Sequence, residues 1–251
     1  MQTHEIVGEI RRAIEAGEFR YRERLPAVRE AASRYEASQQ TVAAAYATLA
    51  ALGLVSTKPG SGTTVAVGKR ADAHLGTFLP PDLSAAEAWK PVQEGSQASE
   101  ETTLVRQISA TKEMESWGIP EGSPVVERTR IRSVDGVPVQ HKITVIPYDL
   151  AAKRPEGYDG VPPMLAPVGA PPTPKPKEIR MADWLGWDVA VTRAAITAEP
   201  MSPAATEALG IPEGSPGFKI INLTLDSSGG IVYATVTTAP LHHRVTLDII
   251  G

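Results

Sequence analysis

The sequence contains no cysteine, and this absence excludes several classes of chemistry at once. Without thiols the chain forms no disulfide bond, has no cysteine nucleophile and offers no thiolate ligand to a metal. It also lacks a signal peptide and any apolar run long enough to cross a membrane, so we expect a cytoplasmic protein with no membrane partner. With 251 residues, the chain is long enough for two modest domains, each with its own core.

Patterns typical of enzymes are missing as well. The histidines show no metal-ligand spacing, and no glycine-rich loop lies between a strand and a helix to hold a nucleotide. No serine or pair of carboxylates is placed as in a catalytic site. We therefore predict no enzyme activity, no catalytic residue, no bound metal and no cofactor. The histidines are His4, His74, His141, His242 and His243.

The charge is unevenly distributed along the chain. The net charge is -4, which by itself would weigh against a nucleic-acid partner. Residues 1–70, however, hold 10 lysines and arginines against 7 glutamates, or +3, which leaves 15 against 22, or -7, for the remainder. A mildly basic head on an acidic body fits a DNA-binding module joined to a domain that avoids DNA.

Residues 25–62 have the pattern of a winged helix-turn-helix. A short helical stretch over residues 27–35 is followed by Ser38, a good N-cap for a second helix. Two short β patterns around a Pro-Gly turn then form a hairpin of wing size. The second helix has an apolar stripe that faces a core, made of Val42, Ala45, Tyr46, Leu49 and Leu52.

The same residues carry a family resemblance. The strings are Leu25-Pro26-x-x-Arg29-Glu30-x-Ala32, Ser38-x-x-Thr41-Val42, Leu49-x-x-Leu52-Gly53-Leu54-Val55 and Pro59-Gly60-x-Gly62-Thr63. Over about the first 67 residues the chain resembles the DNA-binding domain of the GntR family of bacterial regulators. The resemblance implies that Arg29 contacts DNA. The expected DNA-binding residues are Arg29, Ser38, Gln39, Gln40, Thr41, Lys58, Gly60, Ser61 and Gly62.

Three positions depart from the pattern of that family. Gln39 and Ala43 stand where arginines are common, and Ser61 stands at the wing tip where a basic residue is usual. Glutamine pairs geometrically with adenine rather than guanine, so the operator should differ from the common one. The alternative is that Gln39 and Gln40 are only the solvated surface of a helix.

Beyond the head, residues 69–102 lose periodicity, and we interpret them as an interdomain linker. From residue 103 the chain contains an internal repeat: Gly118–Pro124 recurs without change as Gly210–Pro216. Each copy follows a short helical pattern and precedes two β runs joined by a glycine turn. The repeat predicts an α+β domain over residues 103–251, with a pseudo-symmetric antiparallel sheet backed by helices.

The first hairpin gathers positive charge on one face. Arg128, Arg130 and Arg132 alternate and so share a face of their strand. With a three-residue bulged turn, Arg130 faces Lys142 and Arg132 faces Gln140, whereas a two-residue turn would mix the faces. The result is a strand face with four cations and no carboxylate. It is either a solvated face or an anion pocket built from guanidinium groups.

A second resemblance bears on this choice. Residues 117–126, together with Arg130-Ile-Arg132-x-x-Asp135-Gly136-x-Pro138-Val139 and Ile146-Pro147, look like the UTRA effector domain of the HutC subfamily, whose fold is chorismate-lyase-like. This resemblance implies that Arg130 and Arg132 bind an anionic group of an effector. Lys142 and Tyr233 replace carboxylates of relatives at positions near the ligand, which weighs against a sugar phosphate. The effector-binding residues that we expect are Arg130, Arg132, Lys142 and Tyr233.

Together these patterns predict three segments and one leading function. Residues 1–68 form a winged helix-turn-helix, residues 69–102 a linker, and residues 103–251 a UTRA-like domain for effector binding and dimerisation. We expect a homodimeric repressor that binds a pseudo-palindromic DNA operator and responds to a small anionic effector of unknown identity. One alternative is a repressor whose C-terminal domain only dimerises. The other is a lyase-like enzyme for small molecules. The proline-rich stretch 153–176 is either a lid over the pocket or an extended loop.

Overall fold

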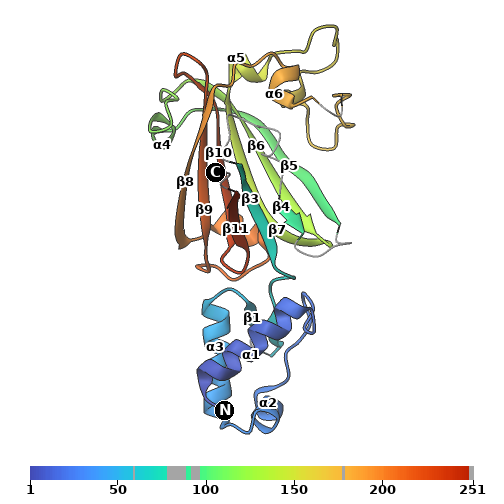
Figure 1. Ribbon diagram of the computed structural model, residues 1–251, viewed down its shortest axis with the longest axis vertical. Helices are drawn as coiled ribbons and strands as arrows, with labels where there is room; N and C mark the ends of the chain where they lie inside the picture. The colour runs from blue at the N-terminus through green and yellow to red at the C-terminus, as the bar shows by residue number, and fades with distance from the viewer. Residues whose placement is uncertain (59, 78–88, 92–96, 177–178, 249–251) are drawn as a thin grey trace.

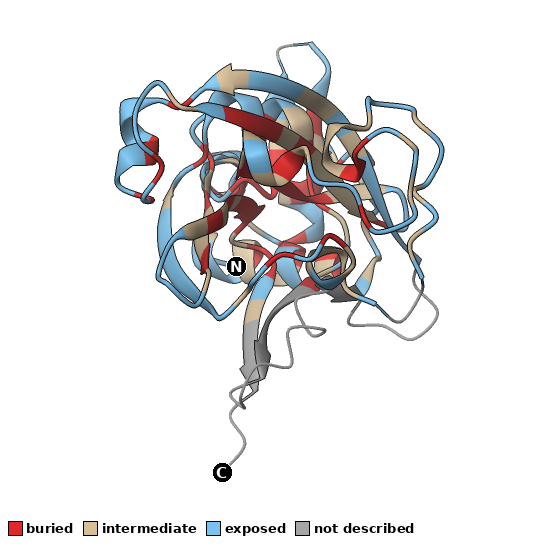
Figure 2. Cartoon of the chain, turned by 90° about the horizontal axis from the view of Figure 1, so that it is seen from above, coloured by how far each residue is buried: buried red, intermediate tan, exposed pale blue. Residues whose placement is uncertain are grey.

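The computed structural model describes residues 1–58, 60–77, 89–91, 97–176 and 179–248. It consists of a helical head, formed by the N-terminal residues, and a larger body built on an antiparallel sheet (Figure 1). Within the described residues, no helix has the length and apolar character needed to span a membrane. In Figure 2, buried residues gather where the sheet meets the elements that cover it.

The head contains three helices and a two-stranded wing, as the sequence predicts. The buried side chains of α1 lie on one face, and the buried side chains of α3 pack against them. Val42, Ala45, Tyr46 and Leu49 are buried as expected, but Leu52 is 39% exposed because it is the C-cap, beyond the last turn of α3. The elements are α1 (Thr3–Ala16), α2 (Val28–Arg34), α3 (Gln39–Ala51), β1 (Val55–Lys58) and β2 (Gly62–Val65).

The body is built on a six-stranded sheet in the order β5-β6-β7-β10-β9-β8. The repeat explains this order: strand, helix and hairpin occur as β5-α4-β6-β7 and again as β8-α7-β9-β10, and the two hairpins meet at β7 and β10. The elements are β5 (Ala98–Ser109), α4 (Lys112–Glu115), β6 (Pro124–Val134), β7 (Val137–Pro147), β8 (Val191–Pro200), α7 (Pro203–Leu209), β9 (Pro216–Leu225) and β10 (Ile231–Pro240).

The register of the first hairpin is the predicted one, but the turn is not. Arg130 pairs with Lys142 and Arg132 with Gln140. The turn itself has two residues, Asp135 and Gly136, both with positive φ, which is the geometry of tight hairpins. A β-bulge directly after the Arg132 pair supplies the extra residue. The bulge therefore determines which side chains share a face of the hairpin, an effect that the prediction attributed to a three-residue turn.

The predicted linker, residues 69–102, contains more regular structure than expected. A small sheet in the order β11-β3-β4 is formed by β3 (Ala71–Thr77), β4 (Trp89–Pro91) and β11 (Arg244–Asp248), and β5 already begins at Ala98. The proline-rich stretch includes the 3-10 helix η2 (Pro163–Leu165). It lies between α5 (Tyr148–Ala151) and α6 (Met181–Trp184), at the end of the sheet far from the head (Figure 1).

The two copies of the repeat have different environments. In the first copy, the helix and turn pack on the sheet, with Met114, Trp117 and Ile119 in one apolar cluster. In the second copy, Met201, Ala205, Leu209 and Ile211 join the core of the head instead. At this contact a Cβ placed at Gly53 would lie 3.0 Å from the Ser215 side chain. The second copy of the repeat therefore packs against the head and forms a contact between head and body.

A second contact between head and body lies at the chain junction. His242 Nε2 lies 2.9 Å from the carbonyl oxygen of Gly68, and the Ala71 amide donates to His243 Nδ1 at 3.1 Å. Arg70 donates to the His242 carbonyl at 3.1 Å and pairs with Glu15 of α1 at 2.5 Å. The turn after β10 thus holds the junction residues and reaches the head through Arg70.

Candidate functional site

The first candidate site is the outer surface of the head. Arg29, near the start of α2, and Gln39 and Gln40, in the first turn of α3, are all exposed. The start of α3 follows α2, and both lie at the end of the head away from the sheet (Figure 1). A helix whose first turn is polar and open in this way can enter the major groove and reach base edges.

Ser38 and Thr41 have a structural task at that surface. The Ser38 hydroxyl accepts a hydrogen bond from the Thr41 amide at 3.0 Å and lies 2.8 Å from the Thr41 hydroxyl. Ser38 is therefore the N-cap of α3, as the sequence predicts, and it fixes where the helix begins. Only their remaining hydrogen-bonding capacity is left for a DNA partner.

The wing residues named by the sequence are exposed. Lys58, Gly60, Ser61 and Gly62 surround the turn between β1 and β2, and the Ser61 amide donates to the Lys58 carbonyl at 3.0 Å. Gly60 and Gly62 have φ of 75° and 80°, so the turn requires residues that tolerate the left-handed region. Pro59 lies outside the described residues. The tip therefore presents backbone groups and the Ser61 hydroxyl, without a positive charge beyond that of Lys58 at its base.

The second candidate site is the face of the large sheet that carries Arg128, Arg130, Arg132 and Lys142, which we call the cationic face. Because antiparallel partners point to the same side, the register places Arg130 opposite Lys142, and Lys142 in turn opposite Thr237 on β10. Arg132 follows two residues along β6. Three of the four effector-binding residues that the sequence predicts thus lie together on neighbouring strands.

Arg128 belongs to the same face but has another role. Its guanidinium donates to the carbonyl oxygens of Met164 at 2.7 Å and of Pro163 at 3.4 Å. Burial and the nearby Arg130 lower the pKa of Arg128 to about 10. Arg128 therefore fastens the proline-rich stretch to the sheet, and this stretch covers one end of the face rather than forming a detached loop.

The carboxylate of Glu100, which the sequence did not predict here, lies beside the cationic residues of this face. Glu100 on β5 pairs in register with Arg132, and its carboxylate lies 2.5 Å from Arg130 Nη1. Burial raises the pKa of Glu100, but Arg130, Lys142 and Arg132 outweigh this effect and hold the pKa below its ordinary value. The prediction of a cationic face without a carboxylate is therefore wrong, because β5 adds one from the segment expected to be linker.

Several polar atoms on this face lack a partner within the described part of the chain. Arg130 Nε and Arg132 Nε are buried without a hydrogen bond, and so are the hydroxyls of Thr144 and Thr235, which face each other across β7 and β10. Buried donors in folded proteins are almost always satisfied by protein, water or ligand. An anion lying against the arginines would satisfy two of these atoms.

The ammonium group of Lys142 adds a further buried positive charge to this face. Burial, followed by the charge of Arg130, lowers the pKa of Lys142 to about 8, and Glu100 offsets this only in part. An ammonium group held beside two guanidinium groups gains most from a negatively charged ligand. The charges on this face would therefore favour an anion over a neutral or positively charged ligand.

Tyr233 lies apart from these residues. It is on β10 beside the bulge, and its ring packs against Trp187 with centroids 5.9 Å apart, in the apolar cluster beneath α5 and α6. It occupies the covered end of the face. Tyr233 therefore contributes to the wall under the proline-rich stretch and not to the cation group.

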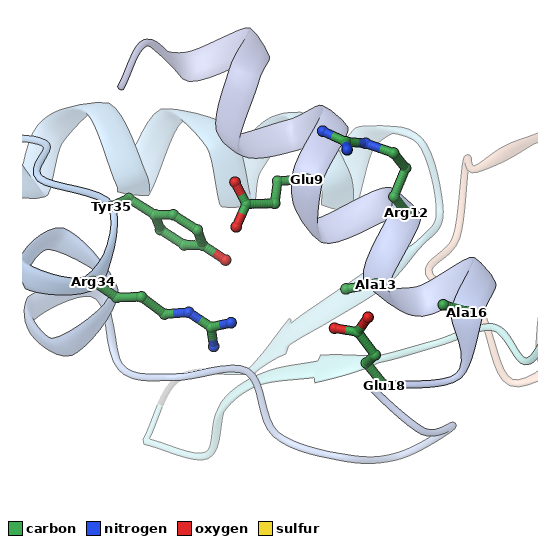
Figure 3. A pocket seen from close by; sticks show the side chains of 7 residues that line it. All are labelled: Glu9, Arg12, Ala13, Ala16, Glu18, Arg34 and Tyr35. Carbon is green, nitrogen blue, oxygen red and sulfur yellow. The ribbon is translucent and has the colours of Figure 1, made fainter.

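A separate hollow of about 310 Å³ lies in the head beside α1 (Figure 3). Figure 3 shows carboxylates and guanidinium groups around the same space, so the opposite charges balance and select neither anions nor cations. It does not extend to the residues of either candidate site. Its lining residues are Glu9, Arg12, Ala13, Ala16, Glu18, Arg34 and Tyr35.

Comparisons with known proteins find one family match in the head and another in the body. The family model of bacterial regulatory proteins, gntR family, matches residues 2–65, and the UTRA domain model matches residues 93–159. No curated protein matches the chain. The two domain matches account for the head and for the first half of the body.

Solved structures share the fold over the full length. A structure described as a GntR-family transcriptional regulator is 17% identical, with a TM-score of 0.51, and the alignment covers 99% of this chain and 96% of that one. PhnF from Mycobacterium smegmatis is 20% identical, with a TM-score of 0.50 and 98% of each chain covered. The chain therefore has an N-terminal segment matched by the gntR family model and a C-terminal segment matched by the UTRA domain model, and it shares its overall fold with these solved structures.

Proposed function

We propose that the protein is a homodimeric repressor of the HutC type that binds a pseudo-palindromic operator. Its affinity for the operator falls or rises when a small anion occupies the UTRA domain. The observation that carries this proposal is the combination of two features in one chain. One is an exposed polar first turn on α3, and the other is a sheet face on which the buried Nε atoms of Arg130 and Arg132 lack hydrogen-bond partners among the described residues.

DNA recognition is assigned to the outer surface of the head. Arg29 would contact phosphate or a base, and Gln39 and Gln40 would read base edges in the major groove. The head is only mildly basic, with a charge of +3 over residues 1–70. Two heads bound to two half-sites would compensate for the weak attraction of one.

Effector recognition is assigned to the cationic face. Arg130, Arg132 and Lys142 would hold the anionic group, while the Thr144 and Thr235 hydroxyls stand ready for a neutral polar part of the ligand. Two contacts could relay a change on this face to the head. These are the β6–β7 hairpin, whose tip reaches Gly68, and the second copy of the repeat.

Dimerisation is assigned to the free edge of the sheet at β8. The side chains of this strand are exposed from Val191 to Ala198, including Val191 at 43% and Ile196 at 44%. An edge strand of this length readily pairs with a second chain. In a two-fold antiparallel pairing centred on Ile196, Arg193 of one copy would lie opposite Glu199 of the other, so that their charges match.

The experiment that tests this function is fluorescence anisotropy of the purified protein on DNA from upstream of its own gene, with salt titrated. We expect binding that weakens steeply with salt and survives an excess of unrelated DNA. Salt-sensitive binding to any DNA, without preference, would contradict specific recognition by Gln39 and Gln40. Absence of binding at low salt would overturn the repressor proposal and favour a small-molecule enzyme.

A further inference from the structure

The feature that carries a further inference is the connector between α1 and α2. It runs from the body side of the head to the end of the head away from the large sheet (Figure 1). On its way it lies along β2. The Leu25 amide donates to the Thr63 carbonyl at 2.9 Å. Arg24 forms an antiparallel bridge with Thr64. The connector therefore adds a short third segment to the wing.

Arg24 lies on the outer face of this extended wing. The next residue, Leu25, is buried in the core of the head together with Val55 and Val65 of the wing strands. Because side chains alternate along an extended chain, Arg24 and Lys58 lie on the opposite face, toward solvent. Among the described residues this outer face contains two cations and no carboxylate. Its members are Arg24, Ser56, Lys58, Gly62 and Thr64.

The positive charge of Arg24 is not neutralised within the described part of the chain. Arg24 is exposed, and its guanidinium makes no hydrogen bond or ion pair there. The neighbouring carboxylate, that of Glu23, instead accepts a hydrogen bond from the Arg20 amide at 2.8 Å and so closes the turn before Arg24. A guanidinium group left in this state is suited to an anionic partner, and its planar donors match the oxygens of a phosphate.

Arg24 also lies between two parts of the surface that we assign to DNA. Its partner Thr64 belongs to the same short strand as Gly62 of the wing turn, and α2 begins soon after Arg24 along the chain. The Tyr46 hydroxyl donates to the Pro26 carbonyl at 2.8 Å, which ties the segment between Arg24 and α2 to α3. Arg24 is therefore held between the wing turn and the start of α2.

From this placement we infer that Arg24 binds a backbone phosphate of the DNA, and that it supplies from the connector the positive charge that the wing tip lacks at Ser61. This inference rests on the proposed function of the head. A phosphate contact fixes the position of the protein on the duplex and carries no sequence information. Arg24 should therefore strengthen binding to every DNA alike, whereas Gln39 and Gln40 are proposed to distinguish one sequence from another.

The test is fluorescence anisotropy of the full-length protein on DNA from upstream of its own gene and on unrelated DNA of equal length, with salt titrated. The variant Arg24→Gln removes the charge and keeps a polar side chain. One phosphate contact contributes about 0.9 to the slope of log affinity against log salt, so the slope should fall by about that amount for each bound head. Relative to 1 M salt, this corresponds to about an eightfold loss of affinity per head at 0.1 M salt. Both DNAs should be affected alike.

Arg22→Gln is the matched control, because Arg22 is an exposed arginine of the same connector that lies nearer the body. Its amide donates at 2.9 Å to the carbonyl of Val65, at the end of β2 away from the wing turn, and its guanidinium lies over the Tyr21 ring, 5.1 Å from the centroid. This variant should leave the slope nearly unchanged.

Two further variants test whether the charge itself is what matters. Arg24→Lys keeps the charge and should keep the slope of the parent. Arg24→Gln/Ser61→Arg moves the charge to the wing tip and should recover most of the lost slope. Thermal unfolding of every variant checks that each is folded.

The outcomes separate the inference from the proposed function. If the parent prefers the upstream DNA and Arg24→Gln keeps its slope, or if Arg22→Gln loses as much, Arg24 contacts no phosphate and the repressor proposal stands. If Arg24→Gln weakens binding to the upstream DNA alone, Arg24 reads bases and the phosphate assignment is wrong. If the parent binds neither DNA at low salt, the proposed function fails and the inference is overturned with it.

Discussion

The side chain of Val137 lies against the backbone of Gly68, where the head joins the body. A Cβ built at Gly68 would lie 3.0 to 3.1 Å from three side-chain atoms of Val137, which is closer than most contacts that Cβ atoms make in proteins. Val137 begins β7, and Lys142 of the cationic face lies five residues further along the same strand. The hairpin that carries Arg130 and Lys142, the proposed effector-binding residues, therefore ends on the interdomain junction.

This relationship predicts that Gly68→Ala forces the junction apart. The added methyl overpacks the contact, so the free energy of unfolding should fall by about 1 to 3 kcal/mol in a chemical denaturation experiment. The double variant Gly68→Ala/Val137→Ala should recover most of that loss. Gly8→Ala is the control, because a Cβ there meets no atom within 4 Å and should stabilise α1 slightly. Equal stability of the parent and Gly68→Ala would contradict the tight contact.

The two histidines at the junction predict a loss of stability in acid. Burial lowers the pKa of His242 to about 4, and burial with the neighbouring His242 lowers that of His243 to about 3, from an ordinary 6.5. The unfolded chain therefore binds protons that the folded chain does not bind between these values. The stabilisation is complete above pH 6.5 and is lost as the pH falls toward 4, by up to about 1.4 kcal/mol per pH unit for each histidine.

The measurement is the unfolding free energy across this pH range, for the parent and for His242→Gln/His243→Asn. Glutamine can still donate to the Gly68 carbonyl, and asparagine can still accept from the Ala71 amide, but neither titrates. The variant should show a flatter profile between pH 4 and 6.5. His4→Gln, an exposed position on α1, should keep the profile of the parent. If the double variant is as acid-sensitive as the parent, the histidines are not responsible.

The sequence predicts those parts of the structure that depend on local pattern. The apolar stripe of α3, the Ser38 cap and the wing follow from residues close together in the chain. So does the pairing of Arg130 with Lys142, because a hairpin brings neighbours in sequence together. The family resemblance of the first 67 residues adds the expectation that the head binds DNA, and the gntR family model matches residues 2–65.

Features that depend on distant contacts could not be predicted in this way. Glu100 lies 30 residues from Arg130, and the first residues of β5 are exposed on both faces, so they show no alternation of apolar and polar residues. The repeat gives no sign that its second copy packs on the head, since the motif residues are identical in both copies. The sequence likewise gives no sign that His242 and His243 become buried against Gly68 and Ala71.

The proposed dimer predicts a charge exchange on β8. Arg193→Glu would place two glutamates opposite each other twice in the pairing centred on Ile196, and the dimer should dissociate more readily in analytical ultracentrifugation. Arg193→Glu/Glu199→Arg restores opposite charges and should recover most of the affinity. The Glu199 carboxylate also lies 3.1 Å from Lys219, so Glu199→Arg alone loses that pair as well as placing two arginines opposite each other, and it should weaken the dimer too. A dimer that is unaffected by all three variants would contradict this register.

Lys142 predicts a pH limit for anion binding. With its pKa lowered to about 8 by burial and by Arg130, the ammonium form dominates below pH 8 and is lost above it. Since only the charged form attracts the anion, sulfate affinity should fall as the pH rises beyond 8, by up to about tenfold per unit. Lys142→Gln should bind more weakly at pH 7 and show no such fall. A sulfate affinity that stays constant through pH 9 in the parent would remove Lys142 from the site.

Arg29 and Arg34 give a matched pair for the DNA surface. Both are exposed arginines on α2, but Arg29 lies near its start, whereas Arg34 lies in its last turn and lines the hollow beside α1 (Figure 3). Arg29→Ala should weaken operator binding by about 1 to 3 kcal/mol and reduce the salt dependence, because it removes a DNA contact. Arg34→Ala removes the same charge from the same helix and should change affinity far less. Equal losses in anisotropy would mean that the head acts through net charge alone, and the assignment of Arg29 would be wrong.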